Sequence, residues 1–180
     1  KTENKTATDV DAVFLGDSIT DGYNLSTYLP SYNLLNRGIG GDTTYGLENR
    51  LKVSAYDVNP KIVFLLIGAN NQKTMFNNYE KIVSNLEQNL PESKIVLVSL
   101  TPFKEPFANH NKQIIECNKK IKEIADNHNL IYLDLFANLF DKNTSQLFAD
   151  YSDDGVHPNA NGYEVMTKQF KIILELLLHK

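Results

Sequence analysis

Short apolar runs alternate along the chain with longer stretches in which apolar residues recur every three or four positions. Residues 62–67 and 95–98 are continuously apolar over the length of a strand. Residues 161–178 carry apolar side chains at the i, i+3, i+4 and i+7 spacing of an amphipathic helix. The pattern predicts strands at residues 12–15, 33–37, 61–67, 94–100 and 130–134, and helices at about residues 43–54, 78–89, 111–127 and 161–178.

Strands joined by helices predict an α/β fold with a three-layer, doubly wound, five-stranded parallel sheet. A continuously apolar strand is covered on both faces, which agrees with helices on each side of the sheet. The 180 residues contain no internal repeat and no Pro/Gly/Ser-rich tract inside the chain. We therefore expect one domain over residues 10–180, preceded by a polar linker at residues 1–9.

Composition and charge narrow the class of protein. Hydrophobic residues make up 42% of the chain and charged residues 22%, as in ordinary globular domains. The net charge is −4 and the 18 Lys and Arg residues are scattered, which argues against a nucleic-acid partner because phosphate contacts need clustered positive charge. No apolar run approaches the roughly 18 residues of a transmembrane helix. The single cysteine, Cys117, shares a helical spacing with Ile114 and Ile121, so we expect it in the core.

The cellular compartment and the oligomeric state stay open at this point. A cysteine-poor chain fits the cytoplasm and an exported protein equally well. Residues 1–8 are polar, lack the apolar core of a signal peptide and begin with Lys1 rather than Met. This start slightly favours export after removal of an upstream signal over a cytoplasmic location.

Residues with catalytic chemistry gather where the predicted strands end. Gly-Asp-Ser-Ile-Thr at residues 16–20 follows the first strand, Gly-Ile-Gly-Gly-Asp-Thr at residues 38–43 the second, and Gly-Ala-Asn-Asn at residues 68–71 the third. Asp-Asp-Gly-Val-His-Pro at residues 153–158 precedes the last helix. Ligands of doubly wound sheets bind beyond the carboxyl ends of the strands, so we expect these loops to converge on one site.

This set supplies what acyl transfer by a serine requires. Ser18 is the candidate nucleophile on a strand-to-helix turn, and His157 is the candidate base that accepts its proton. Asp154, three residues before His157, is placed to orient the imidazole. The candidate oxyanion donors are the Ser18 N–H, the Gly41 N–H and the Asn70 side-chain amide.

Taken singly, each of these residues also has a structural interpretation. Ser18 could cap a helix, the glycines could serve tight turns, and Asn70 could belong to an ordinary turn. A metal site built from Asp153, Asp154 and His157 would be a weak ligand set. The occurrence of all four segments in the correct order favours catalysis.

Other nucleophile and nucleotide motifs do not fit. The α/β-hydrolase fold requires Gly-x-Ser-x-Gly, whereas Ser18 lies in Gly-Asp-Ser-Ile-Thr and follows the first strand. A P-loop requires lysine after its last glycine, and Leu47 follows Gly46. The dinucleotide fingerprint would need a glycine where Thr43 stands.

Together the four segments resemble those of the SGNH hydrolase superfamily, also called GDSL-type lipases and esterases. Residues 16–19 match its first block, Gly41 its second, and residues 68–71 its third, with Asn71 where Asp is common. Residues 154–157 match its closing Asp-x-x-His block. The resemblance covers nearly the whole chain, and four ordered blocks make it specific.

The resemblance implies a flavodoxin-like sheet and a role for each matching residue. Ser18 would be the nucleophile, Gly41 and Asn70 would belong to the oxyanion hole, and Asp154 with His157 would complete a triad. Residues 36–42, Asn-x-Gly-Ile-Gly-Gly-Asp, are also similar to the branch of platelet-activating-factor acetylhydrolase α-subunits. That similarity implies acetyl or other short acyl esters as substrates.

The sequence thus predicts a serine-dependent carboxylic ester hydrolase that forms an acyl-enzyme and acts on short acyl esters of a sugar or lipid alcohol. A lysophospholipase or thioesterase is the alternative activity, and a non-catalytic ligand-binding module is a further alternative. The expected partner is this ester substrate, and the chemistry calls for no cofactor and no metal. The aromatic residues expected near the site, each more typical of packing than of substrate contact, are Tyr23, Tyr45, Phe76 and Phe103.

Overall fold

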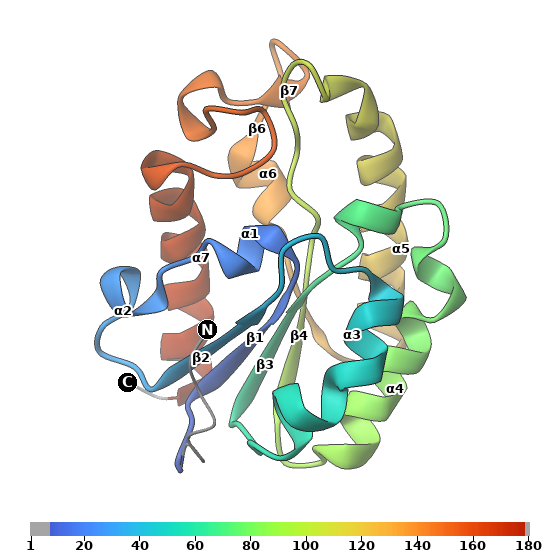
Figure 1. The fold of residues 1–180 in the computed structure, drawn as a ribbon, viewed down its shortest axis with the longest axis vertical. Helices are drawn as coiled ribbons and strands as arrows, with labels where there is room; N and C mark the ends of the chain where they lie inside the picture. Colours follow the sequence, from blue (N-terminus) through green and yellow to red (C-terminus); the bar gives the residue numbers. More distant parts are fainter. Residues whose placement is uncertain (1–7, 179–180) are drawn as a thin grey trace.

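A five-stranded parallel sheet in the order β2-β1-β3-β4-β5 forms the centre of the computed structural model, which describes residues 8–178 (Figure 1). Every neighbouring pair in this sheet is parallel. The order is that of flavodoxin-like folds, and the chain reverses direction across the sheet between β1 and β3. The strands are β1 (Ala12–Gly16), β2 (Leu34–Gly38), β3 (Ile62–Leu66), β4 (Lys94–Val98) and β5 (Ile131–Leu133), with a separate two-stranded hairpin of β6 (Phe140–Asp141) and β7 (Gln146–Leu147).

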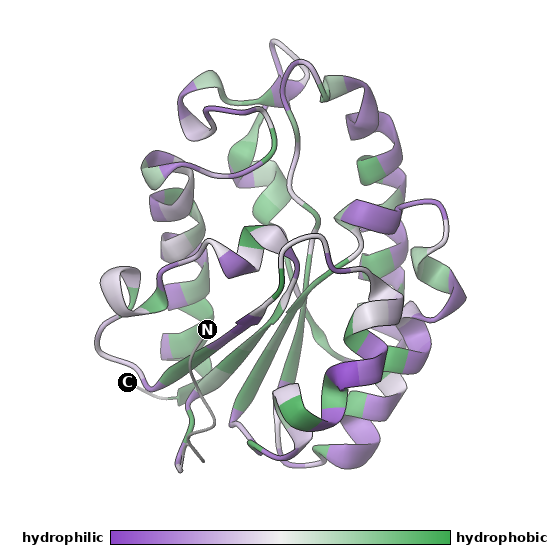
Figure 2. Ribbon diagram, viewed as in Figure 1, coloured by the Kyte–Doolittle hydropathy of each residue, from purple (hydrophilic) through white to green (hydrophobic). Residues whose placement is uncertain are grey.

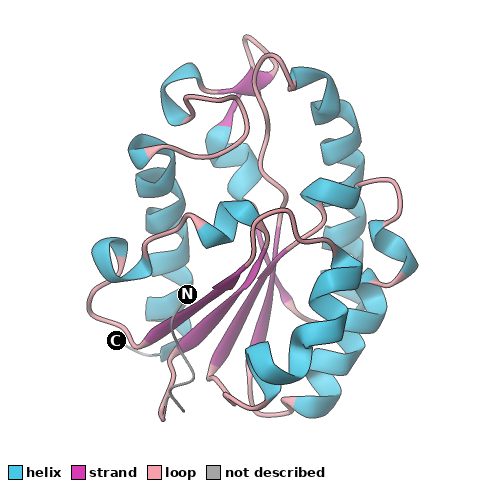
Figure 3. Cartoon of the chain, viewed as in Figure 1, coloured by secondary structure: helices cyan, strands magenta, loops and turns pink. Residues whose placement is uncertain are grey.

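Helices cover both faces of the sheet and make the fold a three-layer α/β structure, as predicted (Figure 3). One face packs on α3, α4 and α5, and the other on α2, α6 and α7. The helices are α1 (Ser18–Asp21), α2 (Leu25–Tyr28), α3 (Thr44–Leu51), α4 (Tyr79–Asn89), α5 (Asn111–Asn127), α6 (Leu135–Leu139) and α7 (Ala160–Leu178). No helix within residues 8–178 is both long and apolar enough to cross a bilayer.

Alternate side chains of each central strand enter opposite cores. In β3, Val63 and Leu65 pack with α3, α4 and α5, whereas Phe64 and Leu66 pack towards α7. This alternation follows from the two-residue period of a strand. Figure 2 shows the consequence: the inner strands are mainly hydrophobic, the edge strand β2 has a hydrophilic stretch, and the helices carry hydrophilic residues along their length. Cys117 is buried on α5, as its spacing predicted.

An aromatic cluster attaches α7 to the sheet. The ring of Phe170 lies 5.0 Å from those of Phe14 and Phe64 and 5.8 Å from that of Tyr23, measured between centroids. Aromatic pairs at these separations stabilise a core beyond the area they bury. Because α7 directly follows the segment that contains His157, this cluster also fixes that segment relative to β1.

The predicted elements are all present, with changes at their ends. The predicted helix 43–54 ends as α3 at Leu51 and continues as one π-helical turn at Lys52–Tyr56. The last two strands are shorter than expected, since β4 stops at Val98 and β5 spans only three residues. The short elements α1, α2, α6, β6 and β7 were not predicted, because two to five residues are too few to show a period.

Most of the predicted linker at residues 1–9 lies outside the described residues. Its last two residues contact the fold, because the Asn33 side-chain amide donates hydrogen bonds to the carbonyl oxygens of Thr8 and Asp9. The Asp9 carboxylate also pairs with Lys61 at 2.8 Å. These two residues therefore belong to the edge of the domain.

We expect Phe170→Ala to lower the free energy of unfolding by about 3–5 kcal/mol, because it removes a buried ring that contacts both β1 and β3. Urea unfolding followed by circular dichroism measures this change. Ile172→Ala on the exposed side of the same helix is the matched control and should cost less than about 1 kcal/mol. Equal effects of the two substitutions would contradict the role given to the aromatic cluster.

Candidate active site

Ser18 lies at the first position of α1, directly after β1. The Asp17 carboxylate caps this short helix by accepting a hydrogen bond from the Ile19 N–H at 3.1 Å. Gly16 makes the turn possible: a Cβ there would lie 2.1 Å from Thr20 Oγ1 and 2.6 Å from the Leu66 carbonyl oxygen. The sharp turn holds the Ser18 side chain half-buried at the carboxyl end of the sheet.

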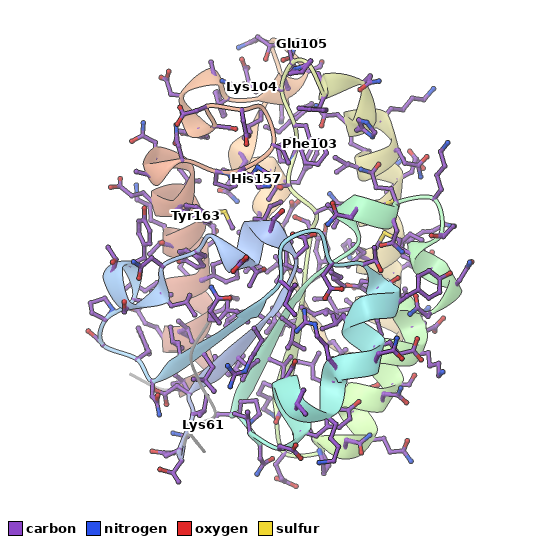
Figure 4. The ribbon with its side chains drawn as sticks, viewed as in Figure 1. Lys61, Phe103, Lys104, Glu105, His157 and Tyr163 are labelled. Carbon is purple, nitrogen blue, oxygen red and sulfur yellow. The ribbon has the colours of Figure 1, made fainter. Side chains whose placement is uncertain are left out.

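His157 and Asp154 meet Ser18 from the other end of the chain. His157 Nε2 lies 2.9 Å from Ser18 Oγ, and His157 Nδ1 lies 2.6 Å from Asp154 Oδ2. The structure therefore brings together the three residues that the sequence singled out as nucleophile, base and orienting acid. In Figure 4 His157 lies above α1, at the opposite end of the sheet from Lys61.

Asp154 is held ionised by the groups around it. Partial burial opposes ionisation, but hydrogen bonds from the His157 ring and from the Val156 and His157 N–H groups bring the pKa of Asp154 far below its usual range. An ionised carboxylate only accepts, so His157 Nδ1 carries the proton of that bond. His157 Nε2 is then the acceptor for the Ser18 hydroxyl, which is the tautomer a general base requires.

The loop that contains His157 is held against the loop after β4. Gly155 has φ +94°, and a Cβ there would lie 2.8 Å from the Glu105 carbonyl oxygen and 3.0 Å from that of Lys104. The Lys104 N–H donates to the Gly155 carbonyl oxygen at 2.9 Å. Only glycine fits this close backbone approach, which explains the glycine in the Asp-Gly-Val-His segment.

The second and third strand-end loops approach Ser18 and each other. The Ile39 N–H donates to the Gly16 carbonyl oxygen at 3.1 Å, and Asn70 Nδ2 donates to the Asp42 carbonyl oxygen at 2.8 Å. Gly41, between them, has φ +75° and is exposed. The predicted oxyanion residues thus lie on loops that are hydrogen-bonded to one another.

Asn71, where the related families commonly have Asp, orders the loop itself. Its Nδ2 donates to Thr44 Oγ1 at 2.9 Å, and its Oδ1 accepts from the Thr44 N–H at 3.3 Å. These bonds connect the turn after β3 to the start of α3, so the Asn71 amide fixes the position of this turn.

Three site residues escaped the sequence analysis. Asp42 forms an ion pair with Arg50, and the Asp17 side chain is buried directly beside Ser18. The eight-residue separation of Asp42 and Arg50 matches no helical pairing rule, so their spacing gave no signal. Asp17 was visible only as part of the Gly-Asp-Ser motif.

The aromatic candidates mostly serve packing. Tyr23 and Phe103 are buried, and the Phe76 ring lies 5.8 Å from that of Tyr79. Tyr45 is 42% exposed, and its hydroxyl accepts a hydrogen bond from Asn77. None of the four lines the pocket beside Asn70.

That pocket has a volume of about 420 Å³ and lies between the turn after β3 and the start of α5. Asn70 belongs to its lining, which connects the pocket to the loops described above. Five of the lining residues have amide side chains, but the surface that faces the pocket is mostly apolar; the lining consists of Ala69, Asn70, Asn71, Gln72, Lys73, Thr74, Asn109, His110 and Gln113.

Residues 14–165 match the model of the GDSL-like lipase/acylhydrolase family. The chain belongs to this family and is, by family, an ester-bond hydrolase. The match covers most of the fold, from β1 into α7, and includes Ser18, Asp154 and His157.

Particular relatives place the chain near one branch of the family. It is 34% identical over 132 residues to the platelet-activating factor acetylhydrolase IB subunit beta homolog of Drosophila melanogaster, covering 66% of this chain and 55% of that relative. It is 28% identical over 181 residues to the platelet-activating factor acetylhydrolase IB subunit alpha2 of Rattus norvegicus, and the match covers 93% of this chain and 77% of that relative. The chain thus spans about half of the length of the fly relative.

Solved structures agree with the fold. A Streptococcus pneumonia protein, provisionally described as a platelet activating factor, has a TM-score of 0.86 and 28% identity over 95% of this chain and 86% of its own. A GDSL-like lipase from Bacteroides thetaiotaomicron has a TM-score of 0.82 and 23% identity, and the match covers 92% of this chain and 87% of the lipase. The SGNH-type resemblance and the flavodoxin-like fold expected from the sequence are confirmed.

Burial raises the pKa of Asp17 to about 6, against the lowering effect of the Ile19 N–H and His157, and Asp42 raises it further. A raised carboxyl pKa means that the native state holds a proton which the unfolded chain has lost, so stability falls as the pH rises from about 4 to about 6.

We therefore expect Asp17→Asn, which keeps an oxygen for the Ile19 N–H, to stabilise the protein relative to wild type by about 2 kcal/mol more at about pH 7.5 than at about pH 4.5. Urea unfolding at both pH values measures this difference. Asp126→Asn, at an exposed position of α5, is the control and should differ from wild type equally at both. A pH-independent effect of Asp17→Asn would contradict the assignment.

Proposed function

We propose that the protein is a serine-dependent carboxylic ester hydrolase that works through an acyl-enzyme intermediate. The observation that carries this proposal is the hydrogen-bonded line from Ser18 Oγ through His157 to Asp154, at 2.9 and 2.6 Å. A nucleophile, a base in the required tautomer and an ionised orienting acid in one line form the arrangement of serine acyl hydrolases.

In the first step Ser18 Oγ attacks the ester carbonyl carbon while its proton moves to His157 Nε2. The tetrahedral intermediate collapses when His157 donates this proton to the oxygen of the departing alcohol, and the acyl group stays on Ser18. Water then attacks the acyl carbon, and His157 accepts a proton from it. Collapse of the second intermediate returns that proton to Ser18 Oγ and releases the carboxylic acid, while Asp154 stays ionised throughout.

Three donors are available for the oxyanion. The Ser18 N–H is at the first position of α1, where no intrahelical acceptor exists. Asn70 Nδ2 carries two hydrogens, and one of them already bonds the Asp42 carbonyl oxygen, which orients the second. The Gly41 N–H completes the set, and all three act on charge that develops only during the reaction.

A metal ion has no part in this proposal. Asp154 and His157 are engaged with each other, and Asp153 accepts a hydrogen bond from Asn159 at 3.1 Å. Among residues 8–178 no group of three or more His, Cys, Asp or Glu side chains is arranged to hold a metal. The residues named above suffice for ester hydrolysis without a cofactor.

A short acyl or acetyl ester of a sugar or lipid alcohol is the substrate class that this proposal names. The pocket beside Asn70, with a volume of about 420 Å³, lies within the size range of small-molecule pockets. The names of the relatives point the same way, since two are platelet-activating factor acetylhydrolase subunits and one, from Ruminococcus flavefaciens, is a multidomain esterase.

Hydrolysis of a p-nitrophenyl ester series from acetate to palmitate tests both parts of the proposal. We expect the highest kcat/KM at acetate or butyrate and its loss in Ser18→Ala. A maximum at long chains would replace the short-acyl assignment with a lysophospholipase or thioesterase. Absence of Ser18-dependent hydrolysis, together with no labelling of Ser18 by a fluorophosphonate, would leave a binding module and overturn the enzyme.

We expect His157→Ala to remove nearly all turnover and Asn70→Ala to lower kcat by about 10²–10³ with little change in KM, because Asn70 acts on the transition state. Steady-state kinetics on p-nitrophenyl acetate measures both. His128→Ala, at the C-terminal end of α5, is the control for His157→Ala, and Asn49→Ala, on α3, is the control for Asn70→Ala. Both controls should keep wild-type kcat. Full activity of Asn70→Ala would contradict its place in the oxyanion hole.

A further inference from the structure

The guanidinium of Arg50 uses all five of its N–H groups within the fold. Nε and Nη2 donate to Asp42 Oδ2 at 2.9 and 2.6 Å, and Nη2 also donates to the Gly16 carbonyl oxygen at 3.1 Å. Nη1 donates to the Arg37 carbonyl oxygen at 2.7 Å and to Ser54 Oγ at 3.1 Å. Five donors in a rigid plane fix the positions of their acceptors relative to one another.

These acceptors belong to the segments that carry the proposed catalytic donors. Gly16 is the last residue of β1, two positions before Ser18. Asp42 follows Gly41, and its carbonyl oxygen accepts the hydrogen bond that orients Asn70. One side chain outside the reacting groups thus connects the nucleophile turn, the Gly41 loop and, through Asp42, the Asn70 amide.

The local sequence makes room for this arrangement. The side chains of Arg50 and Asp42 are 15% and 10% exposed, so their ion pair is shielded from water. Asp42 Oδ1 accepts from the Thr43 N–H at 2.9 Å and lies against α3 at Gly46, where a Cβ would be only 1.9 Å from that oxygen. Glycine at this position leaves the space that the Asp42 carboxylate occupies.

We propose that Arg50 is a positioning residue for the oxyanion hole, which it holds in the reactive geometry by binding Asp42 and the carbonyl oxygens of Gly16 and Arg37. This inference rests on the proposed ester hydrolysis. The guanidinium acts through the backbone of the Gly41 loop and through Asn70. Displacement of such donors by about 1 Å is enough to lower turnover by about 10²-fold.

The test is steady-state hydrolysis of p-nitrophenyl acetate by Arg50→Gln and Arg50→Lys. We expect both to lower kcat by about 10–100-fold and to leave KM within about threefold, because ground-state binding does not depend on the oxyanion donors. Lys keeps the charge but cannot form the planar fork, so recovery of wild-type kcat in Arg50→Lys would overturn the geometric role.

Combination with Asn70→Ala separates positioning from a general structural defect. If Arg50 acts partly through Asn70, the loss in the double variant should exceed that of Asn70→Ala alone, because the Gly41 loop is also affected, but should stay below the product of the two separate losses; the shape of the pH profile should stay that of wild type. Full multiplication of the two losses would show that Arg50 does not position Asn70 and would overturn the proposal as stated. Lys81→Gln is the control: it removes the ion pair between Lys81 of α4 and Glu48 of α3, the helix that carries Arg50, and it should keep wild-type kcat.

A second variant covers the case in which Arg50 substitutions fail to fold. Gly46→Ala favours the helical state of α3 but displaces the Asp42 carboxylate, so kcat should fall while the protein stays folded by circular dichroism. Wild-type kcat in Gly46→Ala and in folded Arg50 variants would overturn the inference while leaving the hydrolase intact. An inactive wild type that no fluorophosphonate labels would instead overturn the proposed function, and this inference with it.

Discussion

The parallel register of β1 with its two neighbours is the constraint on which the site depends. Gly16, at the end of β1, pairs with Gly38 of β2 on one side and with Leu66 of β3 on the other. The three strands therefore end at the same level, and the loops that follow them begin within hydrogen-bonding reach. Strand β1 lies at the point where the chain changes direction across the sheet, which is the place where doubly wound sheets bind their ligands.

Three acidic side chains in the loops at this end of the sheet have different environments and different tasks. Asp154 is partly exposed and surrounded by donors, so it stays ionised and orients His157. Asp42 is shielded but neutralised by Arg50. Asp17 is buried, and the loss of hydration raises its pKa to about 6. The carboxylates are thus distinguished by burial and by the donors each one meets, although all belong to the same set of loops.

The sequence predicted those parts of the structure whose residues follow a recognisable spacing or a recognisable motif. Apolar runs of strand length and the helical spacing of α5 and α7 identified the sheet and its covering layers, and the ordered segments identified Ser18, Asp154 and His157. Short elements such as α1 and α6 lack enough residues for a period to appear. Arg50 was missed because its contacts are with carbonyl oxygens at strand ends and with Asp42, and backbone acceptors leave no trace in the sequence.

The exposure of His157 has a consequence for product release in the proposed reaction. The side chain of His157 is 47% exposed and that of Asp154 is 57% exposed, so the proton-transfer line runs along the surface of the molecule. In the proposed reaction, a leaving alcohol that takes its proton from His157 would already lie at the boundary with bulk water. Its departure would then need no gate to open, and an alcohol part much larger than the acyl group could extend into solvent while the ester bond is cut.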